Sequence, residues 1–147
     1  MILDQLCQLF TGQGIELMFL AIGTYYDVKN QELSLRFLVL FLLAGIFCNV
    51  FFQYQSLSDF LIGGCIGSVF LGVGWLTKEE IGYGDGIGLV ILGILKGWRG
   101  LVPMMVMAFL LSGIYGVWKL IGLKESGDST MPFFPFLLIA SMGMMLI

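Results

Sequence analysis

Four stretches of the sequence contain no charged residue, and each is about as long as one crossing of a lipid bilayer requires. They cover residues 37–58, 60–77, 100–118 and 129–147. A transmembrane helix needs about 20 predominantly apolar residues, so each stretch predicts one membrane-spanning helix. Only 12% of the residues are charged, against about 25% in a soluble domain. The chain is therefore expected to be an all-α integral membrane protein.

Two shorter apolar stretches, residues 17–26 and 86–95, complete a predicted set of six spans. Neither is long enough to cross alone, so each crosses only if part of its charged flank enters the membrane. We expect a single membrane-embedded domain over residues 1–147, a polytopic bundle of six transmembrane helices. The expected spans cover roughly residues 10–28, 37–57, 60–77, 83–98, 100–119 and 131–147.

The distribution of basic residues predicts which way these spans run. If the N-terminus lies outside the cell, five basic residues face the cytoplasm. They are Lys29, Arg36, Lys78, Lys119 and Lys124. Only Lys96 and Arg99 then face outward. Cytoplasmic loops of membrane proteins carry an excess of Lys and Arg, so this orientation is the expected one. Glu16 is then expected as a charge at the outer interface.

The composition excludes several kinds of protein. The chain has no histidine, and its three cysteines, Cys7, Cys48 and Cys65, form no CxxC pair. Zincin motifs, Ser-His-Asp triads and Cys-His dyads are therefore excluded, and no metal or other cofactor is expected. The net charge is −3 and no block of Lys and Arg is present, so the chain is not expected to bind nucleic acid.

Glycine is frequent, with 21 of 147 residues, and many glycines lie inside the apolar stretches. Gly63 and Gly67 lie four residues apart in one of these stretches. Small residues at this spacing allow membrane helices to approach closely. These glycines therefore predict tight helix packing and not flexible loops.

Two aspartates lie beside the shorter predicted spans. Asp27 follows a Tyr-Tyr pair at the inner end of the first span, and Asp85 lies in the segment Gly-Tyr-Gly-Asp-Gly, residues 82–86, at the inner start of the fourth. Two complete spans separate them, and an even number of crossings returns a chain to the same face of the membrane. Both carboxylates are therefore expected on the cytoplasmic side. A charge inside a span costs at least ~2.5 kcal/mol, so each requires a partner, water or a function.

Two carboxylates held close together suit the hydrolysis of a peptide bond. The reaction needs one base to activate water and one acid to protonate the substrate. Two neighbouring carboxylates share one proton between them and so supply both roles. Asp27 and Asp85 are therefore the predicted catalytic pair. The backbone beside Asp85 is expected to let an extended peptide approach closely, along Gly82, Tyr83, Gly84 and Gly86.

Each aspartate also has an ordinary structural interpretation. Asp27 would cap the loop that contains Lys29, and the glycines before Asp85 would form a turn that precedes a helix. The shared membrane face, the two short spans and the Gly-x-Gly-Asp sequence together favour the catalytic interpretation.

Three segments of the sequence resemble the type IV prepilin peptidases, which are membrane aspartic proteases of the Gly-x-Gly-Asp type. They are Tyr26-Asp27 with Lys29, then Gly82-Tyr83-Gly84-Asp85, and finally Pro132-Phe133-Phe134-Pro135-Phe136-Leu137. The archaeal preflagellin peptidases are relatives of this family. The resemblance extends over nearly the whole chain in order and spacing.

The resemblance implies a six-helix bundle in the cytoplasmic (inner) membrane with its active site facing the cytoplasm. Asp27 and Asp85 would be the catalytic pair of an endopeptidase that removes a short basic leader from prepilin- or pseudopilin-like substrates. The product would enter a type IV pilus or a protein-secretion machine. Many bacterial members also N-methylate the product through a region with paired cysteines, whereas here peptidase activity alone is expected, without S-adenosylmethionine. The expected partners are the leader peptide and the lipid bilayer, and a homo-oligomer is left open.

The sequence departs from the family pattern at three places. Leu33-Ser34 stands where the family often has Ile-Pro, and Gly88 stands where it often has Lys. Phe134 replaces the glycine of the Pro-Phe-Gly-Pro segment. None of these changes removes a predicted catalytic carboxylate.

Three other functions remain open for the same residues. The first is a non-catalytic membrane component of an assembly machine. The second is a small proton or cation transporter that uses the two carboxylates. A relative of presenilin or signal peptide peptidase would also show a Tyr-Asp and a Gly-x-Gly-Asp. Those proteins have more spans and a Pro-Ala-Leu element, which is absent from this sequence.

Overall fold

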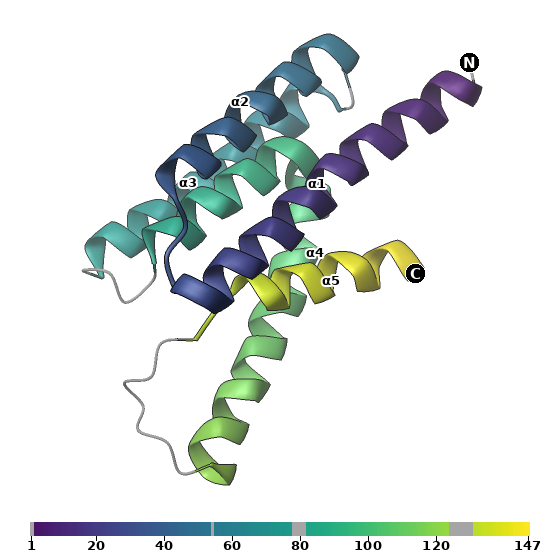
Figure 1. Cartoon of the computed structure of the whole chain (residues 1–147). Helices are drawn as coiled ribbons and strands as arrows, with labels where there is room; N and C mark the ends of the chain where they lie inside the picture. Colours follow the sequence, from purple (N-terminus) through teal and green to yellow (C-terminus); the bar gives the residue numbers. More distant parts are fainter. Residues whose placement is uncertain (1, 54, 78–81, 124–130) are drawn as a thin grey trace.

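The computed structural model describes residues 2–53, 55–77, 82–123 and 131–147, and all regular structure in these ranges is helical. The helices are α1 (Ile2–Asn30), α2 (Leu35–Phe52), α3 (Leu57–Leu76), α4 (Tyr83–Gly122) and α5 (Phe134–Leu146). Figure 1 shows α2 and α3 running alongside the first half of α4, while α5 lies against α1. The predicted all-α fold is confirmed. Lys78 and Lys124, two of the residues used to predict the orientation, lie outside the described ranges.

Three of these helices, α2, α3 and α4, are long and apolar enough to cross a membrane, and α5 is a shorter apolar helix. Six separate spans are not confirmed, because the two spans expected at residues 83–98 and 100–119 form one element, α4, of 40 residues. A straight helix of that length would measure about 60 Å, twice the ~30 Å thickness of the hydrocarbon core.

A break at Gly97 divides α4 into two helical segments. Gly97 has φ 69° and ψ 174°, a backbone conformation that is essentially restricted to glycine. Figure 1 shows the two halves of α4 running in different directions from this break. The boundary expected between two spans is therefore present as a break inside one continuous element.

The carbonyl oxygen of Ile94, three residues before the break, accepts hydrogen bonds from two side chains. The amide of Asn49 donates to this oxygen at 3.4 Å, and the amide of Gln55 donates to it at 2.5 Å. An unpaired backbone group in an apolar environment costs several kcal/mol. Asn49 near the end of α2 and Gln55 before α3 thus hold the backbone next to the break.

Glycines bring α3 and α4 into close contact, as the four-residue spacing predicts. A Cβ atom on Gly63 would overlap the backbone carbonyl of Gly93, and one on Gly67 would lie 2.5 Å from Cα of Val90. Neither position accepts a side chain unless the helices move apart. The prediction of tight packing at Gly63 and Gly67 is confirmed, and it fixes the first half of α4 against α3.

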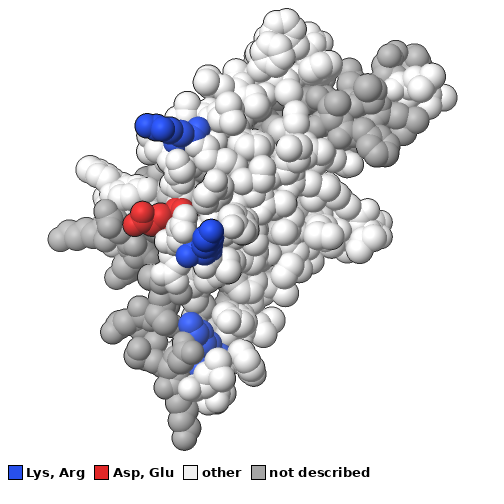
Figure 2. Space-filling model, viewed as in Figure 1, with Lys and Arg blue, Asp and Glu red and all other residues white. Residues whose placement is uncertain are grey.

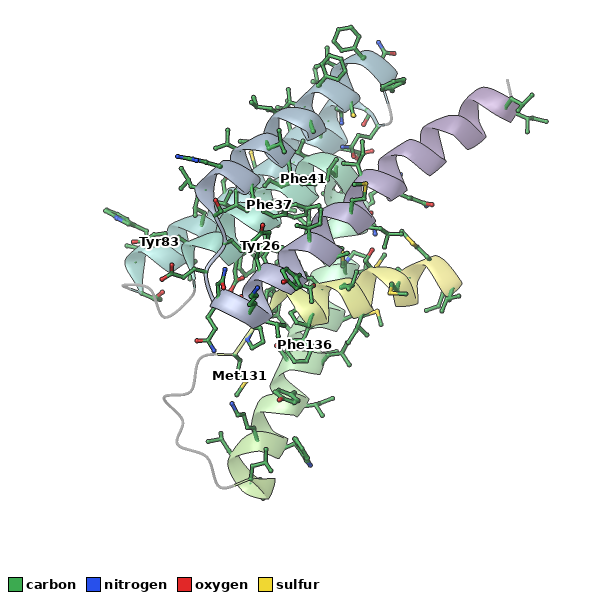
Figure 3. The ribbon with its side chains drawn as sticks, in the orientation of Figure 1. Tyr26, Phe37, Phe41, Tyr83, Met131 and Phe136 are labelled. Carbon is green, nitrogen blue, oxygen red and sulfur yellow. The ribbon has the colours of Figure 1, made fainter. Side chains whose placement is uncertain are left out.

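An aromatic cluster joins α1, α2 and α5. The ring of Phe19 in α1 stacks on Phe37 of α2 with centroids 5.5 Å apart, and it meets Phe41 at 5.1 Å. It also meets Phe134, at the start of α5, edge-on at 5.6 Å. Figure 3 shows Phe37 and Phe41 on the side of α2 that faces α1, beside Tyr26. The cluster places the start of α5 against the middle of α1.

The outer surface of the bundle is apolar. Large hydrophobic side chains such as Leu40, Phe47 and Val50 are exposed along α2, and the other helices expose similar residues. Soluble monomers rarely expose contiguous apolar patches of more than a few hundred Å². Figure 2 shows one face almost free of charged side chains, with the few that are visible on its left half. The exterior is therefore suited to lipid.

Glu16, which is expected near the outer interface of the membrane, is buried inside the bundle. Only 2% of Glu16 is exposed. Its Oε1 lies 2.7 Å from Nζ of Lys96, and the hydroxyl of Ser141 donates to the same oxygen. The three residues join α1, α4 and α5. Lys96 therefore turns inward to a partner that is distant in sequence, whereas Arg99, the other basic residue expected to face outward, is 76% exposed.

We predict that Lys96→Met lowers the stability of the bundle strongly, because it leaves the Glu16 carboxylate buried without its cation. Removing one partner of a buried ion pair costs about 3–5 kcal/mol, whereas replacing both with apolar residues is often neutral. The double variant Glu16→Met/Lys96→Met is therefore expected to recover most of the loss. The measurement is the thermal unfolding midpoint of the detergent-solubilised chain, with the exposed Arg99→Met as the matched control. Equal midpoints for Lys96→Met and Arg99→Met would contradict this prediction.

Candidate active site

Asp27 and Asp85 line the same cavity, which has a volume of about 610 Å³. It lies where α1 ends and where α4 and α5 begin, and Figure 1 shows these three helix ends at the same end of the molecule. The two residues are far apart in the sequence, but their carboxyl groups are close enough to interact electrostatically. The fold therefore brings both predicted site aspartates to one place.

Asp27 lies in the last turn of α1 and is only 8% exposed. The helix ends just beyond it: the amide of Gln31 donates to the Asp27 carbonyl at 3.0 Å, and Gln31 has a left-handed φ of 54°. The dipole of α1 disfavours a negative charge at this end. A carboxylate held here therefore requires compensation from another part of the fold.

The start of α5 supplies that compensation. The backbone N–H of Phe134 donates to Oδ2 of Asp27 at 3.0 Å, and the N-terminal end of a helix favours a negative charge. The helix has no side-chain cap of its own. Asp27 thus acts as the cap of α5, from a position 107 residues away in the sequence.

The sequence at the start of α5 leaves this N–H free for Asp27. The first amides of a helix have no partner within the helix. Pro135 has no N–H to satisfy, and the amides of Phe136 and Leu137 both donate to the carbonyl of Phe133. Phe134 therefore carries the first helical amide that needs an acceptor from outside, and Asp27 provides that acceptor.

Asp85 lies in the first turn of α4, where a helix dipole favours a carboxylate. The turn begins at Gly82, whose carbonyl accepts hydrogen bonds from the amides of Asp85 and Gly86 at 3.0 and 3.2 Å. The Gly-x-Gly-Asp segment is therefore the start of a helix, and this start directs the aspartate into the cavity. Asp85 thus lies at the N-terminus of α4, and Asp27 accepts a hydrogen bond from the N-terminus of α5.

The glycines near Asp85 have two different surroundings. Gly82 and Gly84 line the cavity together with Tyr83. Gly86 does not, because it is packed against α3, where a Cβ atom would lie 2.9 Å from Cα of Leu71. Of the four residues predicted to form a backbone surface for a peptide, three lie at the cavity and Gly86 packs between helices.

Other parts of the cavity wall were not predicted from the sequence. Glu32 lies on this wall just after α1. Three aromatic rings form an apolar side: Phe70 and Phe109 have centroids 5.7 Å apart, and Phe109 and Phe133 are 5.1 Å apart. Hydropathy gives no signal for these rings, since they are indistinguishable in sequence from residues that face lipid. Within the described ranges, no three His, Cys, Asp or Glu side chains form a group that could hold a metal ion.

The long apolar helices and the apolar exterior indicate a helical membrane protein, and two aspartates line one of its cavities. Residues 15–117 match the type IV leader peptidase family, and this range contains both aspartates. The chain belongs to that family.

Similar proteins are described as prepilin leader peptidase/N-methyltransferase. The one from Pseudomonas aeruginosa is 32% identical over 141 residues, which cover 89% of this chain and 49% of that protein. The one from Pectobacterium carotovorum is 33% identical over 140 residues, or 87% and 48%. The one from Stutzerimonas stutzeri is 32% identical over 120 residues, or 78% and 42%. The chain thus spans about half the length of these relatives, or less, and no solved structure matches it.

We predict that Asp27→Ala destabilises the chain more than Asp27→Asn does. Alanine leaves the buried N–H of Phe134 without an acceptor, at a cost of about 1–3 kcal/mol, whereas the asparagine side chain retains a carbonyl oxygen in nearly the same place. The comparison uses the thermal unfolding midpoints of both variants and of the unaltered chain in detergent. If both variants unfold at the same temperature, Asp27 does not cap α5 as described.

Proposed function

We propose that this chain is a membrane aspartic endopeptidase that removes leader peptides from type IV prepilin-like proteins, with Asp27 and Asp85 as its catalytic pair. The single observation that carries the proposal is that Asp27 and Asp85, which are far apart in the sequence, line one cavity. Membership of the type IV leader peptidase family supports the same reaction and substrate class.

The two carboxyl groups provide both proton transfers that the hydrolysis needs. Two close carboxyl groups hold one proton between them, because like charges at short range do not both ionise. The ionised member takes a proton from a water molecule, which attacks the scissile carbonyl carbon. The protonated member donates its proton toward the substrate.

The cavity wall fits a leader that is basic and is followed by an apolar segment. Glu32 gives the wall an acidic group that a basic leader would pair with. The rings of Phe70, Phe109 and Phe133 offer an apolar surface for the segment beyond the cleavage site. Gly82 and Gly84 have no side chains, so an extended backbone is able to approach Asp85 closely.

We place the site at the cytoplasmic face of a six-span bundle in the inner membrane, with the two halves of α4 as separate crossings. The break at Gly97 supports this arrangement, because it lets the chain change direction inside α4. The half after the break, residues 98–122, is long enough for one crossing, whereas the half before it, residues 83–96, is shorter and crosses only if part of its flank enters the membrane. The excess of Lys and Arg on one side of the six spans supports the orientation. The lipid bilayer and the leader peptide are the partners of this arrangement.

We predict that Asp27→Asn and Asp85→Asn each reduce leader removal by about 10²–10⁴-fold, the usual contribution of a positioned acid or base. The measurement is processing of a co-expressed prepilin-like substrate, followed by its change in size on a gel.

The matched control is Asp59→Asn. Asp59 does not line the cavity, and it accepts a hydrogen bond from Trp98 at 2.7 Å instead. This variant is expected to process the substrate at the unaltered rate. Normal processing by both Asp27→Asn and Asp85→Asn, in chains that still insert into the membrane, would refute the proposed function. A proton or cation flux that depends on either aspartate would then indicate a transporter.

A further inference from the structure

The ring of Phe134 lies between the two helices that carry the aspartates. Phe134 is fully buried. A Cβ atom on Gly23 of α1 would lie 2.5 Å from Cδ1 of this ring, and one on Gly88 of α4 would lie 2.6 Å from its Cζ. The ring is therefore in contact with backbone on both sides, and neither helix is able to carry a side chain at the contact.

The two contact points are each about one helical turn from an aspartate. Gly23 precedes Asp27 by four residues, and Gly88 follows Asp85 by three. Residues three or four apart lie on the same face of a helix. The distance between α1 and α4 at the ring therefore determines the distance between the two carboxyl groups, which lie one helical turn away.

Phe134 is itself held in place from two directions. Its ring meets the ring of Phe19 edge-on at 5.6 Å, an arrangement that aromatic pairs favour. Its N–H donates to Oδ2 of Asp27 at 3.0 Å. One residue thus separates the two helices with its side chain and orients one carboxylate with its backbone.

We propose that Phe134 is a positioning residue whose ring sets the separation between the Asp27 and Asp85 carboxyl groups, with Gly23 and Gly88 as the surfaces that receive it. This inference rests on the proposed function of the aspartate pair. Added bulk on either glycine pushes one aspartate away from the other, and loss of the ring removes the spacer. A displacement of about 1 Å at a reacting group is enough to reduce a rate by about 10²-fold.

The test is a double-variant cycle on the full-length chain in detergent, measured as steady-state cleavage of a synthetic peptide with a basic leader and an apolar continuation. Gly88→Ala, Gly23→Ala and Phe134→Ala are each expected to lower kcat by about 10- to 100-fold with little change in KM. In the Phe134→Ala background, Gly88→Ala and Gly23→Ala are expected to have no further effect, because the ring that they displace is gone. Phe134→Leu, which keeps much of the bulk, is expected to retain most of kcat.

The matched controls are Gly72→Ala and Gly113→Ala, since no atom lies within 4 Å of the Cβ positions of Gly72 and Gly113. Both controls should keep the unaltered kcat. If the effects of Gly88→Ala and Phe134→Ala on kcat multiply independently, or if only KM changes, the spacer role is overturned.

A second readout separates this inference from the proposed function. Thermal unfolding of the same variants measures the contact without any substrate, and Gly88→Ala should lower the unfolding midpoint only while the Phe134 ring is present. If the unaltered chain cleaves no leader peptide, the proposed function fails, and this coupling alone then decides whether the ring separates the two helices. An equal drop in the midpoint with and without the ring would overturn the spacer.

Discussion

The hydrogen bond from the Phe134 N–H to the Asp27 carboxylate joins two helix ends that are each unsatisfied alone. A carboxylate in the last turn of α1 opposes that helix dipole, and the first amide of α5 has no acceptor within its own helix. This one hydrogen bond gives the Asp27 carboxylate a donor and the Phe134 amide an acceptor. It also brings the Pro-Phe-Phe-Pro segment to the cavity, where the start of α4 adds Asp85 from the other side.

Other polar groups inside this apolar bundle are also paired with groups from other parts of the chain. The Ile94 carbonyl near the Gly97 break is paired with Asn49 and Gln55, and Glu16 is paired with Lys96 and Ser141. Water is scarce in lipid, so an unpaired polar group there is costly. These contacts hold the helices in place at points away from the cavity. The site is thus one of several places where polar groups from different helices meet and fix the packing.

The sequence predicts much of this architecture, because charge-free stretches and glycine spacing are local signals. They indicate the helices, the close packing at Gly63 and Gly67, and the return of both aspartates to one end of the bundle. Local signals fail where the partner is distant in the chain. Lys96 and Arg99 are both expected to face outward, although Lys96 turns inward to Glu16. Nothing in hydropathy distinguishes Phe134, whose contacts with Gly23 and Gly88 depend on three different helices.

In the proposed reaction, Asp27 and Asp85 act together on one substrate group. The most direct test is the affinity of a peptide isostere of the leader junction whose scissile bond is replaced by a hydroxyl-bearing carbon, measured by isothermal titration calorimetry. Mimics of a transition state bind at least about 10²-fold more tightly than substrates. Asp27→Asn and Asp85→Asn are each expected to lose this advantage, while Asp59→Asn keeps it. Equal affinity of the isostere for the unaltered chain and for either cavity variant would show that the two aspartates do not act as a pair.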